Sequence, residues 1–133
     1  MDLSVYVQEA RKEAEPIPVK SGTKGFEKIL EGSYPVTIRA GYGAFTILFE
    51  DYIAFSVRNE SFAHTRVKED YSLKLRIYNK SEFLDYVSEA TFANFNYPGP
   101  FKHYSLVCAN HVIDVACQTE PTVEHRIICQ NEI

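Results

Sequence analysis

The sequence predicts an α+β fold: a single, mostly antiparallel curved sheet of five to six strands, with one main helix at about residues 81–93 packed on a face. Short N-terminal helical turns are expected before the sheet. Two observations lead to this fold class. From Tyr34 onward, apolar and polar residues mostly alternate with the period of two that is typical of strands, and short turns separate the segments. In the 81–93 segment, apolar residues recur instead with helical spacing.

Length and composition favour one α+β domain over residues 1–133. With 45% hydrophobic and 24% charged residues, a chain of 133 residues can bury a core without disulfides or metals. Nine Phe and nine Tyr with no Trp are unusual, and aromatic side chains bring large contact areas. We interpret most of these rings as core, and the remainder as the lining of a pocket or an interface.

The charge of the chain does not favour nucleic-acid binding. The formal net charge is −4 and the isoelectric point is near 5.6, whereas nucleic-acid binding draws most of its affinity from basic groups. The one basic stretch, residues 66–80, is predicted to place Lys74 and Arg76 on the solvated face of a strand, opposite Leu75 and Ile77. No nucleic-acid partner is therefore expected.

No apolar run approaches the ~18–20 residues needed to cross a bilayer, so no membrane association is expected. The first residues lack the basic start and apolar stretch of a signal peptide. Three cysteines, an odd number, do not suit a secreted disulfide framework. We therefore expect a cytoplasmic location.

The elements before residue 81 are expected to be helical turns followed by strands. Ser4 can cap a short helix that ends at Pro16, and residues 25–32 can form one or two further turns. Residues 44–59 are predicted to form a hairpin with its tip at 50–51, and this hairpin is expected to be central because both of its faces are apolar. Residues 59–71 are expected to be a loop, and 72–78 a strand.

The main helix is predicted to begin at Ser81, or at Asn79 through its capping-box spacing to Glu82. Residues 94–100 (NFNYPGP) are expected to form an ordered turn or loop, because two prolines around a glycine can continue no regular element. The inward stripe of the helix is predicted to consist of Phe83, Leu84, Val87, Ala90 and Thr91.

Residues 102–118 are predicted to form a closing hairpin with its turn at Ala109–Asn110. This register pairs Leu106 with Ile113 and Tyr104 with Val115, which gives one apolar face for the core. It places His103, Ser105 and Asp114 on the other face, with Ser105 directly across from Asp114.

This polar face is the best candidate for a chemical site. Asp114 is close enough to orient His103, which would then serve as the catalytic acid or base near neutral pH. Ser105 is a ligand-binding candidate rather than a nucleophile, because no turn exposes it in mid-strand. The alternative interpretation is a solvated sheet face without function.

A second candidate is the polar cluster of Arg58, Glu60 and His64, which follows the predicted central hairpin. Such residues at the mouth of a curved sheet suit a small polar ligand, but they also suit an ordinary loop with a local ion pair. The thiols Cys108 and Cys117 lie near His111, but the ligand pattern is incomplete for structural zinc, and we interpret both thiols as small buried side chains. No metal or cofactor is predicted.

The profile as a whole favours a small acidic cytosolic binding module. We expect it to recognise a partner protein, in a regulatory or immunity-like role, through aromatic anchors and an acidic rim. The alternative is a small-molecule-binding domain or small enzyme, with a pocket against the sheet and His103 and Asp114 as its working pair. The sequence does not settle whether a reaction is catalysed, nor the oligomeric state.

Overall fold

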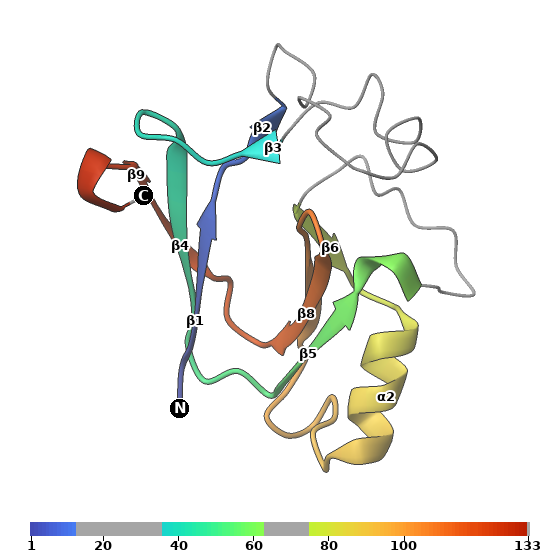
Figure 1. The fold of residues 1–133 in the computed structure, drawn as a ribbon. Coiled ribbons are helices and arrows are strands. Elements are labelled where there is room, and N and C mark those ends of the chain that lie inside the picture. The colour runs from blue at the N-terminus through green and yellow to red at the C-terminus, as the bar shows by residue number, and fades with distance from the viewer. Residues whose placement is uncertain (13–35, 63–74, 133) are drawn as a thin grey trace, which may run out of the picture. The chain divides into compact units, whose positions relative to one another are not determined.

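The computed structural model describes residues 1–12, 36–62 and 75–132 (Figure 1). A four-stranded sheet has the order β5 (Ala54–Asn59), β8 (His111–Cys117), β7 (Lys102–Val107), β6 (Leu75–Tyr78), and a three-stranded sheet has the order β1 (Leu3–Gln8), β4 (Gly43–Phe49), β9 (Thr122–Ile127). The α+β class with antiparallel sheets is confirmed. The prediction of one sheet of five to six strands is wrong, because the strands divide between these two sheets.

The described elements belong to two compact units. The first contains Met1–Ser4 and Leu48–Thr122, with the four-stranded sheet and helix α2 (Glu82–Ala90). The second contains Val5–Ile47 and Val123–Ile133, with most of the three-stranded sheet and the short pair β2 (Arg11–Lys12) and β3 (Val36–Thr37). The prediction of one domain over residues 1–133 stays a prediction.

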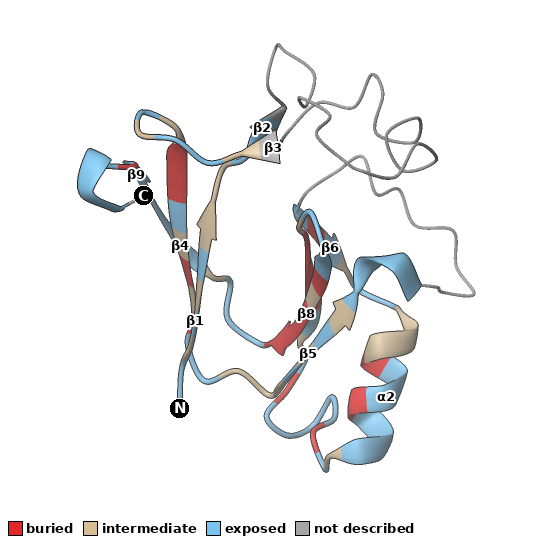
Figure 2. Cartoon of the chain, in the orientation of Figure 1, coloured by how far each residue is buried: buried red, intermediate tan, exposed pale blue. Residues whose placement is uncertain are grey.

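The closing hairpin forms the middle of the four-stranded sheet. Strands β7 and β8 pair antiparallel in the predicted register, with Leu106 opposite Ile113 and Ser105 opposite Asp114. Both strands are flanked by further strands, and their residues are buried on both faces, as the red segments of β8 in Figure 2 show. The polar face is therefore covered rather than solvated.

Helix α2 covers the face that carries His103 and Asp114. Its buried residues Leu84 and Val87 pack on Ala116 of β8, which is the ladder partner of His103. Ser81 caps the helix, since its hydroxyl accepts the backbone N–H of Leu84 at 3.1 Å, which confirms one of the two predicted starts. Of the predicted inward stripe, Leu84 and Val87 are buried, whereas Ala90, the last residue of the helix, is exposed.

The opposite face of this sheet carries apolar side chains on all four strands. Its centre is buried, with Val115 fully covered and Tyr104 packed edge-on against Phe49 at 5.6 Å between ring centroids. Its two outer strands remain partly open. The exposed apolar side chains are Phe55 and Val57 on β5, and Leu75 and Ile77 on β6.

Strand β6 overturns the prediction that its basic side chains face solvent. Arg76 is only 7% exposed, whereas Leu75 and Ile77 are 45% and 53% exposed. The inversion follows from the ladder, in which Arg76 lies opposite Ser105 and therefore on the face that α2 covers. Lys74 lies outside the described residues.

The prediction of N-terminal helical turns is wrong for the first twelve residues. Residues 1–12 contain no helical turn among those described, and Val5, Tyr6 and Val7 belong to strand β1 instead. Their β-branched and aromatic side chains favour a strand once a partner strand is available. The helical turns expected at 25–32 lie outside the described residues.

The expected central hairpin at 44–59 is not formed either. Strand β4 pairs with β1 and β9, while β5 pairs with β8, so the segment between them joins two sheets. At the expected tip, Asp51 has a left-handed φ of 48° and its carboxylate accepts a hydrogen bond from the N-terminal ammonium of Met1 at 2.9 Å. Local alternation predicted both strands, but it did not indicate which partners they choose.

Candidate functional site

His103 and Asp114 lie in direct contact inside the first unit. The Nε2 of His103 and the Oδ1 of Asp114 are 2.6 Å apart, and both residues are 1% exposed. Because a carboxylate only accepts hydrogen bonds, Nε2 carries the proton of this bond. The proximity of the two residues, predicted from the hairpin register, is confirmed.

Two further side chains extend this contact into a chain of polar groups. The Ser81 hydroxyl lies 2.8 Å from His103 Nδ1, while Arg58 approaches Asp114 Oδ2 through Nε at 3.0 Å and through Nη2 at 2.9 Å. We call these four residues, Ser81, His103, Asp114 and Arg58, the His103 network. It joins the N-cap of α2 to strands β7, β8 and β5.

The His103 ring is enclosed as well as hydrogen-bonded. The rings of Tyr78 and Phe83 lie 5.0 and 4.8 Å from it, centroid to centroid. Both ring nitrogens are engaged, so the imidazole has no nitrogen left to offer a ligand without breaking the network. This arrangement suits the clamping of α2 onto the sheet better than proton transfer to a substrate.

The charges around Asp114 keep it ionised. Burial raises the pKa of this carboxyl group, but the hydrogen bond with His103 and the charges of His103 and Arg58 act against burial. The pKa of Asp114 lies below its ordinary value as a result. A buried carboxylate with such partners is stable only while they remain in place.

The order of hydroxyl, imidazole and carboxylate in the network is that of a serine hydrolase triad. Two features separate it from one. The Ser81 hydroxyl is already the cap of α2, and the contact between His103 and Asp114 is closed to solvent. None of its members lines the cavity described next.

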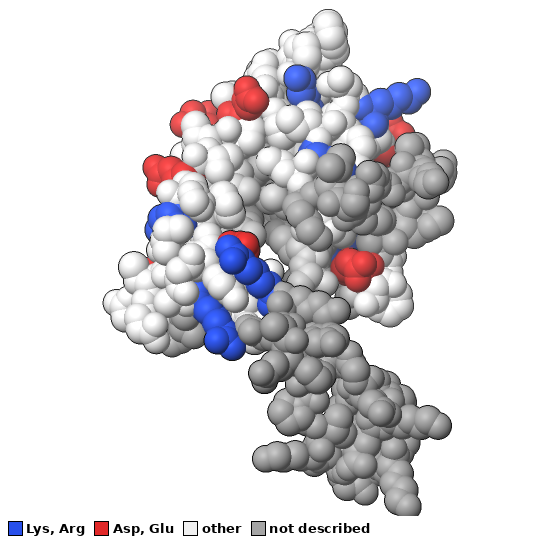
Figure 3. Space-filling view, turned by 90° about the horizontal axis from the view of Figure 1, so that it is seen from above, with Lys and Arg blue, Asp and Glu red and all other residues white. Residues whose placement is uncertain are grey.

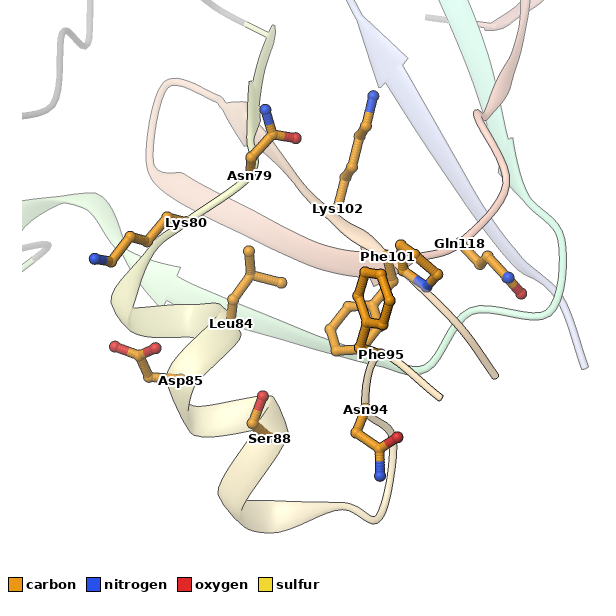
Figure 4. Close-up of a pocket in the computed structure, with 11 residues that line it drawn as sticks. Asn79, Lys80, Leu84, Asp85, Ser88, Asn94, Phe95, Phe101, Lys102 and Gln118 are labelled. Carbon is orange, nitrogen blue, oxygen red and sulfur yellow. The ribbon is translucent and has the colours of Figure 1, made fainter. Parts of the chain in front are cut away.

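A hollow of about 500 Å³ lies beside α2. Leu84, Asp85 and Ser88 of the helix form one wall, and the rings of Phe95 and Phe101 lie across from them (Figure 4). The ammonium groups of Lys80 and Lys102 point outward, away from these rings. The remaining lining residues are Asn79, Asn94, Pro100 and Gln118. We call this cavity the α2 hollow.

Four large rings stand exposed on α2 and the loop that follows it, and one of them, Phe95, also lines the hollow. Phe92 is 81% exposed, Phe95 77%, Tyr97 65% and Tyr86 58%. The rings of Phe92 and Tyr97 stack at 6.2 Å between centroids. Single exposed apolar side chains are common, whereas four aromatic rings within twelve residues of sequence are not. We call these four residues the aromatic surface.

The loop that carries these rings is held by its own hydrogen bonds. The Asn94 side chain accepts the backbone N–H groups of Asn96 and Tyr97 at 2.8 and 3.0 Å. Gln118, at the end of β8, donates its amide to the Pro98 carbonyl at 2.9 Å. The predicted ordered loop at 94–100 is therefore confirmed, and its rings are presented on a fixed backbone.

The other predicted site residues are not gathered into one place. Ser105 is buried under α2, across the ladder from Asp114. Glu60 is exposed in the 3₁₀ turn η1 (Glu60–Phe62), and His64 lies outside the described residues. Among the described residues, no group of three or more His, Cys, Asp or Glu side chains is placed to hold a metal ion.

Sequence reasoning missed two partners of the His103 network. Arg58 was assigned to a separate cluster, because β5 was paired with β4 rather than with β8. Ser81 was predicted as a helix cap, and nothing in the sequence indicated that β7 runs beneath that cap. The aromatic surface did have a signal in the motif FANFNYPGP, whose rings have no alternation that would bury them.

No protein-family model, curated protein or solved structure matches this chain. Within the described part of the chain, no helix has the length and apolar character required to cross a membrane.

Proposed function

We propose that this chain is a binding module that recognises a partner protein through the aromatic surface formed by Tyr86, Phe92, Phe95 and Tyr97. The observation that carries the proposal is the exposure of these rings, which ranges from 58% to 81%. Aromatic side chains are frequent anchors of protein interfaces, because one ring buries a large area at a small cost in side-chain entropy.

The fixed backbone of the loop supports this role. Because Asn94 and Gln118 already hold residues 94–98, little conformational entropy remains to be lost when a partner binds. The adjacent α2 hollow offers a recess in which the partner can place an apolar side chain against Leu84, Phe95 and Phe101.

Charge favours a basic partner segment. Helix α2 carries Glu82, Asp85 and Glu89 and no Lys or Arg, and Asp85 and Glu89 lie on its exposed side beside Tyr86. A cation of the partner can meet both these carboxylates and the aromatic faces. On the face seen in Figure 3, basic and acidic groups are interspersed among the described residues.

The test is capture with matched variants. The purified chain, the variants Phe92→Ser and Phe95→Ser, and the control Phe62→Ser would be immobilised, and the proteins retained from the source cell's extract would be quantified. Phe62 is 84% exposed but lies outside the aromatic surface. We expect one protein to be retained in stoichiometric amount by the wild type and by Phe62→Ser, and at least tenfold less by the other two variants.

The captured protein would then be purified and its association rate measured at several salt concentrations. An association rate that decreases as ionic strength rises, and that is lower in Asp85→Lys than in the wild type, supports recognition of a basic partner by the carboxylates of α2. The proposal would be overturned if the Phe92→Ser and Phe95→Ser variants retained the captured protein as well as the wild type does. It would also be overturned if the wild type retained no protein in stoichiometric amount.

The alternative, a small-molecule-binding domain or small enzyme that uses His103 and Asp114, has one observation in its favour: the triad-like order of the His103 network. Its weakness is that His103 and Asp114 are closed to solvent. A fluorophosphonate probe that labels Ser81 in the wild type, but not in His103→Ala, would raise this alternative above the binding module. We expect no labelling, because the Ser81 hydroxyl is engaged in capping α2.

A further inference from the structure

Strand β5 forms an edge of the four-stranded sheet without the usual protection of an edge. Among the residues that the structure describes, β5 pairs with β8 alone (Figure 1). Natural edges are commonly guarded by proline, by bulges in mid-strand or by outward-facing charges. The six residues of β5, AFSVRN, include no proline, and their one charged side chain, Arg58, turns inward to Asp114.

The direction of the backbone groups of β5 follows from its ladder and from the hydrogen bond at its C-terminal end. The N–H of Glu60 donates to the Asn110 carbonyl at 3.0 Å, in the same register that pairs Ala54 with Ala116. Just before the strand, the Ile53 N–H donates to the Ala116 carbonyl at 2.8 Å, one residue out of this register. Because every second residue of an antiparallel ladder exchanges backbone hydrogen bonds with its partner, the Glu60 bond directs the backbone groups of the even-numbered residues of β5 toward β8. The N–H and C=O groups of Phe55 and Val57 therefore point away from the sheet.

The side chains of the same two residues are apolar and open, with Phe55 46% and Val57 55% exposed. Both lie on the face of the sheet opposite α2, since their ladder partners are Val115 and Ile113. An edge with outward hydrogen-bonding groups and exposed apolar side chains is a template for one more strand.

We propose that β5 pairs antiparallel with β5 of a second copy of this chain, about a twofold axis at Ser56. This register is self-complementary. It places Phe55 opposite Val57 of the partner copy and Val57 opposite Phe55, which are favourable aromatic and β-branched cross-strand pairs. It also places Arg58 opposite Ala54, so that no like charges meet across the axis. The two four-stranded sheets become one continuous sheet.

Position 56 provides a test that is specific to this register. In the proposed pair, Ser56 faces Ser56 of the other copy at a non-hydrogen-bonded position, where Cα atoms are about 4.5 Å apart and a disulfide fits. In a Cys129→Ser background, which removes the exposed native thiol, Ser56→Cys is expected to form a covalent dimer on mild oxidation. The matched control is Asn59→Cys, which the same register separates from its own copy by about 20 Å.

Sedimentation of the wild type between about 10 µM and 1 mM would measure the unlinked dimer, which we expect to be weak because one strand pair buries a small area. Val57→Lys is expected to raise its Kd at least tenfold, because it charges the edge. Ile77→Lys, on the opposite edge strand and with a similar native exposure of 53%, is expected to leave the Kd unchanged.

Equal cross-linking at positions 56 and 59, a wild type that remains monomeric throughout, or equal effects of the two lysine variants would each overturn the proposal. Because none of these positions belongs to the aromatic surface, failure of the dimer leaves the capture experiment untouched. Failure of the capture experiment likewise leaves the dimer untouched.

Discussion

At the scale of single residues, the most consequential group is the buried carboxylate of Asp114. It accepts hydrogen bonds from both His103 and Arg58 and is only 1% exposed. Replacing Asp114 by Ala is therefore expected to lower the free energy of unfolding by about 3 kcal/mol, because the two partners lose their acceptor. Urea unfolding followed by circular dichroism would measure this loss. The exposed helix residue Asp85, changed to Ala, is the control and should cost less than about 0.5 kcal/mol.

The same carboxylate predicts how stability depends on pH. The pKa of Asp114 is lower in the folded chain than its ordinary value of about 3.9, so the folded state binds protons less readily than the unfolded state. The contribution of Asp114 is therefore fully present above about pH 5 and is lost as the pH falls through 3.9 toward the folded value. Unfolding measured from pH 6 to pH 3 should show this decrease in the wild type and a shallower one in Asp114→Asn. Curves of equal slope would show that the network does not couple to protonation.

At the scale of elements, the Ser81 side chain both caps α2 and contacts His103. The Ser81 hydroxyl accepts the Leu84 N–H and also contacts His103, so Ser81→Ala removes a cap and a network partner together. We expect a loss of about 1–2 kcal/mol in the free energy of unfolding, more than the loss of a cap alone in most helices. Ser88→Ala, on the exposed side of the same helix, should be neutral or slightly stabilising. If the loss is the same in a His103→Ala background, the contact between Ser81 and His103 contributes nothing.

Two glycines with left-handed φ angles allow a comparison of backbone strain with crowding. Gly41 has φ 93° with nothing near its missing Cβ, whereas a Cβ at Gly99, φ 113°, would lie 2.9 Å from the Gln118 amide nitrogen. Gly41→Ala is expected to cost about 1 kcal/mol from strain alone. Gly99→Ala should cost more, and it should also weaken partner capture, because Gln118 would release the loop that carries the aromatic surface. Equal losses of stability would mean that Gln118 moves aside freely.

The elements that the sequence predicted correctly are those specified by local interactions. The hairpin at 102–118 and the helix from Ser81 each contain their own turn or cap, so the register and the start can be read from neighbouring residues. The pairing of β5 with β8 joins residues 52 to 62 positions apart, and no local pattern encodes it. Arg58 therefore could not be assigned to Asp114. Arg76 was placed on the wrong side of its strand because its face is set by the pairing of β6 with β7, which is also distant in the sequence. The alternating pattern of the hairpin at 102–118 also predicts that the face with His103 and Asp114 is exposed to solvent. In the structure both faces of this hairpin are buried.

At the scale of the whole molecule, stability is expected to be uneven. Strands β7 and β8 are buried along most of their length, whereas every residue of β9 is exposed. Amide exchange is limited by local opening, which is easiest where few side chains are covered. Hydrogen–deuterium exchange should therefore be slowest in 103–107 and 112–117 and much faster in 122–127. Asp114→Ala should accelerate exchange in β7, β8 and α2 together, because the His103 network joins these three elements, while leaving 122–127 unchanged. Acceleration confined to β8 would mean that the His103 network does not stabilise the contact between α2 and the sheet. Apolar packing alone would then hold α2 in place.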